Sequence, residues 1–139
     1  MTPRWEHFHH DADIGVRGIG PTLDTAFEQA ALALTAIVTD CDELSDEVQV
    51  EFHCAAPNLE LLFSDFLNEL IYAMSTRRLL FRRCEVHIDD TALDALAFGE
   101  PVDRDKHAPA VEPKGATLTE LHVARDPDGQ WSAQCVVDV

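Results

Sequence analysis

The residues best suited to chemistry are concentrated in the tract 5–16, which reads WEHFHHDADIGV. Within seven residues of this tract lie three imidazoles and two carboxylates: His7, His9, His10, Asp11 and Asp13. The other end of the sequence offers more oxygen ligands, because a strand-like run leads to Asp138 directly before the carboxylate of Val139. If the two ends meet in space, Asp13, Asp138 and that carboxylate form an oxygen-rich cation site.

The histidines and Asp13 each allow two interpretations. Successive side chains of an extended strand point to opposite faces, so His7 and His9 share one face while His10 faces the other. A transition-metal site built from all three histidines is therefore geometrically awkward. Asp13 lies where the chain leaves this strand, and its carboxylate can either cap local amides or bind a hard cation. Oxygen-only ligands suit Ca²⁺ or Mg²⁺ rather than zinc or copper.

Two further positions carry charges that could serve a site. Asp65 and Glu69 are spaced i, i+4 on the polar side of a predicted helix. They form either a solvated acidic face or part of a cation-binding or partner-binding surface. Lys114 is one of only two lysines and leads into a predicted strand. It could contact a phosphate or pair with a nearby acid.

The composition restricts the class of partner. The 139 residues match one compact domain spanning 1–139, and 26 acidic against 10 basic residues give a formal charge of −16. Such a surface repels phosphate backbones, so no direct binding of nucleic acid is expected. An acidic protein is suited instead to cations or to a basic protein. The only basic cluster is interpreted as solvated flanks or ion-pair partners: Arg77, Arg78, Arg82 and Arg83.

Several classes of protein are excluded by what the sequence lacks. The four cysteines are scattered without a CxxC pair, which argues against a zinc ribbon and for reduced thiols. No apolar run is long enough to cross a bilayer, and residue 1 is not followed by a signal-peptide pattern, so a cytoplasmic protein is expected. No Ser-His-Asp order, Gly-rich phosphate loop or HExxH motif occurs, which predicts a protein that is not itself an enzyme.

Hydrophobic periodicity predicts the elements that must position these residues. Two apolar stripes at helical spacing each follow a capping residue, Thr22 for a helix ending near Asp40 and Asn58 for a helix over 59–74. A polar loop over 99–107 and a tight turn over 126–129 are also predicted. Alternating patterns predict strands over 3–9, 14–20, 47–53, 80–88, 93–99, 117–124 and 131–139. This order favours an α+β fold, with two helices packed on a mixed, largely antiparallel sheet.

Taken together, these features resemble the archease family over nearly the whole chain. The first motif, HDADIGV at 10–16, is close to the family's opening HTADIG. The remaining motifs follow in order at suitable spacings: 22–31, 66–72, 99–107, 114–117 and 131–139.

The resemblance implies a function and a site. Archeases assist the GTP-dependent RNA ligase of tRNA splicing and RNA repair, promoting its guanylylated-histidine intermediate and multiple turnover. The implied fold contains a strand–helix–strand–strand module. The implied metal site, described with calcium, maps onto Asp13, Asp138 and the terminal Val139, with Lys114 and Glu69 in a supporting functional role.

The chain departs from the family pattern at Asp11, which replaces a threonine, and at Leu118 and Thr119, which replace an aromatic residue and a histidine. If that histidine engages the ligase, this chain couples differently or serves a diverged partner. One alternative function is an acidic chaperone or protein-binding modulator with a broader clientele. A hydrolase using Asp13 and Asp138 around a metal is the weakest alternative, because no nucleophile accompanies the acids.

Overall fold

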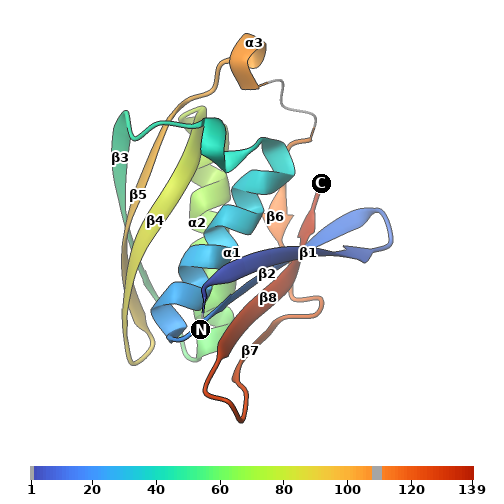
Figure 1. The fold of residues 1–139 in the computed structure, drawn as a ribbon, viewed down its shortest axis with the longest axis vertical. Helices are drawn as coiled ribbons and strands as arrows, with labels where there is room; N and C mark the ends of the chain where they lie inside the picture. Colours follow the sequence, from blue (N-terminus) through green and yellow to red (C-terminus); the bar gives the residue numbers. More distant parts are fainter. Residues whose placement is uncertain (1, 108–110) are drawn as a thin grey trace.

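Two antiparallel sheets enclose a pair of helices in the computed structural model, which describes residues 2–107 and 111–139, with the backbone alone at Arg104. One sheet has the order β1-β2-β8-β6 with β7 also paired to β8, and the other has the order β3-β5-β4. Helices α1 (Leu23–Val38) and α2 (Leu59–Thr76) lie between them (Figure 1). The strands are β1 (Arg4–His10), β2 (Asp13–Gly20), β3 (Val48–Ala55), β4 (Leu79–Asp89), β5 (Ala92–Pro101), β6 (Gly115–Ala116), β7 (His122–Arg125) and β8 (Trp131–Asp138). The predicted α+β class is confirmed.

Both long helices begin at the predicted capping residues. The Thr22 hydroxyl accepts a hydrogen bond from the Thr25 amide at 3.1 Å, and Thr25 Oγ1 accepts one from the Thr22 amide at 3.0 Å. At the start of α2, the Asn58 side chain accepts from the Leu61 amide at 2.9 Å. Each cap satisfies an amide that has no partner within the helix. Helix α2 ends at Thr76 with Arg77 as its C-cap, and Arg78, with φ 52°, turns the chain into β4.

Helix α1 approaches the sheet at backbone distance. A Cβ at Gly18 of β2 would collide with the carbonyl oxygen of Ala26 and the amide nitrogen of Ala30. Glycine is therefore required at position 18, and the facing side chains of α1 must be as small as alanine. This contact, with β4 on the other side, buries α1 on nearly all sides. Its Phe27 meets Phe63 of α2 edge-on, with ring centroids 5.0 Å apart.

Helix side chains occupy the hydrogen-bonding edges of both sheets. On α1, Asp24 and Glu28 accept hydrogen bonds from the amides of Ile88 (3.0 Å) and Val86 (2.8 Å) in β4. On α2, Glu60 accepts from the Val123 amide of β7 at 2.9 Å. Burial raises the pKa of Glu28, and its bond to the Val86 amide opposes that shift. These contacts satisfy edge amides that would otherwise be open to another strand.

The predicted strand over 117–124 is wrong in its first half. Strand β6 ends at Ala116 and β7 begins only at His122. Between them the chain turns, because Thr117 Oγ1 accepts from the Thr119 amide at 3.1 Å and Glu120 adopts φ 56°. The threonine hydroxyl offers the backbone a local alternative to the strand ladder.

The predicted polar loop over 99–107 is also partly wrong. Strand β5 continues to Pro101, and residues Arg104–His107 form the short helix α3. The interpretation of the arginine cluster as ion-pair partners is confirmed for two members. Arg82 and Arg83 of β4 both contact the Asp46 carboxylate, Arg83 at 3.0 Å and Arg82 at 3.6 Å.

Substituting Gly18 tests the close approach of α1 to β2. Gly18→Ala is expected to lower the free energy of unfolding by about 2–3 kcal/mol, because the added methyl group has only backbone to displace. Gly115→Ala is the matched control, since a Cβ there would meet Asn68 Oδ1 at an ordinary 3.6 Å. Its effect is expected to stay within about 0.5 kcal/mol. Urea unfolding followed by circular dichroism measures both values, and equal stabilities would contradict the packing argument.

Candidate functional site

The hairpin between β1 and β2 presents two acidic residues at its tip. His10 pairs with Asp13, so the turn consists of Asp11 and Ala12. Asp11 adopts φ 52°, a left-handed conformation that aspartate tolerates better than most residues. Its side chain is 93% exposed and approaches His10 Nδ1 at 3.8 Å. Asp11 therefore adds a solvated charge close to Asp13.

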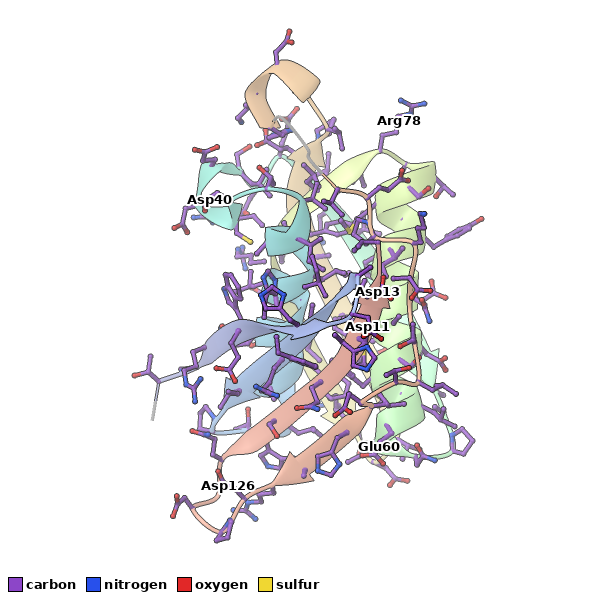
Figure 2. The ribbon with its side chains drawn as sticks, turned by 90° about the vertical axis from the view of Figure 1, so that its right-hand side faces the viewer. Asp11, Asp13, Asp40, Glu60, Arg78 and Asp126 are labelled. Carbon is purple, nitrogen blue, oxygen red and sulfur yellow. The ribbon has the colours of Figure 1, made fainter. Side chains whose placement is uncertain are left out.

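The C-terminal end of β8 lies beside this turn. Strand β2 pairs with β8 in a register that sets Ile14 opposite Val137. The next position in that register places Asp13 beside Asp138, on the same face of the sheet. Asp13 Oδ1 also accepts a hydrogen bond from the Val139 amide at 3.2 Å. Figure 2 shows Asp13 beside the end of β8. The structure thus brings together Asp13, Asp138 and Val139.

Strand β6 borders these residues on the other side of β8. The Lys114 amide donates to the Asp138 carbonyl at 2.8 Å, and Gly115 pairs with Asp138. The Ala116 amide donates to Asn68 Oδ1 at 2.9 Å, which ties β6 to α2. Glu69 follows Asn68 and is exposed. Lys114 is therefore next to Asp138, and Glu69 lies on the helix beyond β6.

Side chains alone do not form a complete metal site in the described structure. Among residues 2–107 and 111–139, no three His, Cys, Asp or Glu side chains are placed so that they could hold one ion together. The set formed by Asp13, Asp138 and Val139 contains two such side chains. Carboxylate oxygens at an exposed sheet end are chemically suited to a hard cation. The thiols of Cys41 and Cys54 are poor alternative metal ligands, because burial raises the pKa of each to about 11 and keeps the thiol protonated.

The histidine tract lies as strand alternation predicted. His7 Nε2 is 2.7 Å from the Ala33 carbonyl oxygen of α1, and its ring lies 4.9 Å from that of Trp5. His10 projects from the opposite face of β1, toward Asp11. The three imidazoles do not converge, so a common ion at this tract is disfavoured.

Glu100 is the centre of a buried polar cluster that was not predicted from the sequence. The Glu100 carboxylate accepts from Lys106 Nζ at 2.7 and 2.9 Å and from His107 Nε2 at 3.3 Å. His107 Nδ1 accepts from the Asp103 amide, so the proton of this imidazole is on Nε2. The signals in the sequence were the mixed charges of 99–107 and the family motif over the same residues, and neither one pairs Glu100 with Lys106 or His107. A strict alternation would put Glu100 on the outer face of β5, but α3 folds over it.

A pocket of about 490 Å³ adjoins this cluster, lined by Glu47, Glu100, Pro101, Val102, Asp103 and Lys106. The bond from Lys106 is the main reason why the pKa of Glu100 is lowered from its usual 4.5. Because the ammonium group of Lys106 in this pocket is already paired with Glu100, we interpret the cluster as the contact that holds α3 against β5.

No helix in the described part of the chain is long and apolar enough to cross a membrane.

The family of the chain follows from comparison with known proteins. Residues 5–139 match the model of the Archease protein family (MTH1598/TM1083). The chain belongs to the archease family. Proteins named archease from Pyrococcus furiosus and Thermococcus gammatolerans are 38% and 39% identical to it, over 98% of this chain and 99% of each relative. The solution structure of Methanobacterium thermoautotrophicum protein 1598 superposes with a TM-score of 0.83 at 29% identity, covering 97% of this chain and 98% of that protein.

The Glu100 cluster predicts a pH-dependent stability. Glu100→Gln is expected to lower the free energy of unfolding at pH 7 by about 1–3 kcal/mol, since it weakens hydrogen bonds to a charged group. The pKa of Glu100 in the folded protein is lowered from 4.5, so its contribution is present above that pH. It is lost as the pH falls through the lower folded value. Urea unfolding at pH 7 and pH 3.5 should therefore show the difference from wild type shrinking in acid. Glu43→Gln, at an exposed position, is the control. A difference independent of pH would contradict the assignment.

Proposed function

We propose that this protein is a non-catalytic cofactor of a GTP-dependent RNA ligase, promoting its guanylylation and multiple turnover in tRNA splicing or RNA repair. The observation that carries the proposal is the match to the archease family over residues 5–139. The contact between Asp13 and Val139 supports it, because it brings together residues of the first and last family motifs. We place this function in the cytoplasm.

The proposed cofactor is Ca²⁺ or another hard divalent cation, held by Asp13, Asp138 and the carboxylate of Val139. Like charges directly opposite in a strand pair destabilise it, and a bound cation would offset the repulsion between the two aspartates. Calcium takes about six to eight oxygen ligands, so the three groups would leave positions for further oxygens. The cation would fix the end of β8 against the β1–β2 turn.

The proposed partner is the ligase protein rather than RNA. A formal charge of −16 disfavours contact with a phosphate backbone and favours a basic protein surface. Lys114 and Glu69 flank the proposed cation and are our candidates for supporting contacts. Leu118 lies in the turn before β7 and is 68% exposed, an apolar side chain suited to burial against a protein.

Removing either carboxylate should abolish or greatly reduce the effect on the ligase. Asp13→Ala and Asp138→Ala are expected to fold, because each removes a polar group from the end of a strand rather than core volume. Both should lower stimulation of ligase guanylylation under turnover conditions by at least about tenfold. Asp128→Ala, in the turn before β8, should stimulate as wild type does.

Two controls accompany this experiment. The protein without ligase should form no covalent nucleotide adduct and join no RNA. Equal stimulation of unrelated clients would favour a general chaperone. Full stimulation by both aspartate variants would show that the proposed site is not needed.

The contribution of the Val139 carboxylate is tested by changing its position. Ca²⁺ that binds only the folded state raises the melting temperature as its concentration rises. A short C-terminal tag converts the carboxylate into a peptide carbonyl, which still coordinates calcium, so the shift should become smaller. Deleting Asp138 and Val139 should remove it. Equal shifts in all three proteins would place the ion elsewhere, with Asp65 and Glu69 the next residues to test.

A further inference from the structure

The outer face of the three-stranded sheet carries three metal-ligating residues in one cross-strand row. His53 of β3 pairs with Asp94 of β5, and Asp94 pairs with His87 of β4. Directly paired residues of antiparallel strands project from the same face of a sheet, so the three side chains share a face. All three are exposed, whereas their neighbours Phe52, Ala95 and Val86 are buried on the opposite face. Figure 1 shows α1 and α2 on that buried side only.

The spacing of this row suits a shared ion. Neighbouring strands are about 4.8 Å apart, so the backbones of the two histidines are about 10 Å apart with Asp94 midway. His53 Nδ1 already lies 2.6 Å from Asp94 Oδ1. Two imidazoles reaching inward over a central carboxylate supply two nitrogens and one oxygen, a set that selects Zn²⁺, Co²⁺ or Ni²⁺ over Ca²⁺.

The surroundings of the row favour a cation. Glu51 and Glu85 lie in the adjacent cross-strand row, on either side of Leu96. The Glu51 carboxylate is 3.7 Å from His53 Nε2, where it can orient the ring toward an ion. Carboxylates beside ligating histidines typically raise metal affinity in this way. The same carboxylates concentrate cations near the face.

Forming the site requires side-chain rotation. The three groups do not converge as they stand, consistent with the finding that the described residues contain no preformed cluster. Exposed side chains change rotamer on the picosecond to nanosecond timescale, so convergence requires no change in the backbone. The N-terminal histidines are worse placed, because His7 contacts the Ala33 carbonyl and His10 projects from the other face of β1.

We propose that His53, Asp94 and His87 bind one divalent transition-metal ion, such as Zn²⁺, with water in the remaining position. This site lies on the sheet that does not contain β1, β2 and β8, so it is separate from the proposed calcium site. Two of its three ligands are borderline-soft nitrogens, whereas the calcium site offers oxygens alone. The two sites can therefore be tested independently of each other.

Calorimetric titration of the full chain with Zn²⁺, in a buffer containing excess Ca²⁺, tests the proposal. The wild type is expected to bind one equivalent with micromolar or better affinity. His87→Gln and Asp94→Asn should each weaken this binding by at least about tenfold. His9→Gln is the matched control and should bind as wild type does. Circular dichroism confirms that each variant is folded. Co²⁺ substitution should give the visible absorption of a nitrogen-ligated ion in the wild type and in His9→Gln, but not in His87→Gln or Asp94→Asn.

Two results would overturn the site. One is the absence of saturable Zn²⁺ binding by the wild type. The other is an affinity of His87→Gln equal to that of wild type, in particular if His9→Gln is the variant that weakens binding, since the ion would then occupy the N-terminal tract. Neither result bears on the ligase function, because the readout is metal affinity alone.

Discussion

The close approach of α1 to β2 is the constraint on which the rest of the architecture depends. Because Gly18 has no side chain, the backbone of β2 can lie against Ala26 and Ala30 of the helix. A helix held this close by one sheet leaves its other side for β4, so both sheets pack on the same pair of helices. Protein interiors are close-packed, so a single added methyl group at this contact would shift several elements and destabilise the fold.

The packing of the two helices between the sheets also explains the position of three acidic side chains. Asp24 and Glu28 of α1 and Glu60 of α2 accept hydrogen bonds from strand amides that have no partner strand. These carboxylates therefore stabilise the edges of the sheets rather than a binding surface. Asp13 and Asp138 are used differently: they come together in the sheet register at the β1–β2 turn and the end of β8, where they are the proposed cation ligands.

What could be predicted from the sequence depended on whether the signal was local. Thr22 and Asn58 were predictable as caps because a cap bonds an amide within its own first turn. The strand over 117–124 was wrong because a threonine hydroxyl competes locally with the ladder. Glu100 was missed because Lys106 and His107 reach it only after α3 folds back. The row formed by His53, Asp94 and His87 is likewise set by strand register, which no local pattern contains. The meeting of Asp13 with Val139 could be stated only as a condition, and the family resemblance singled it out.

The position of β8 also has a consequence for how the protein reaches its folded state. This strand follows every other element in chain order, yet it lies between β2 and the short strands β6 and β7. During synthesis on the ribosome, β1, β2 and α1 emerge early, but one side of β2 has no neighbour until β8 arrives. Pairings between segments so distant in sequence are slow and leave unpaired edges in the meantime. An interrupted chain that lacks β8 would therefore leave one side of β2 unpaired, and it would also lack Asp138, one of the proposed cation ligands.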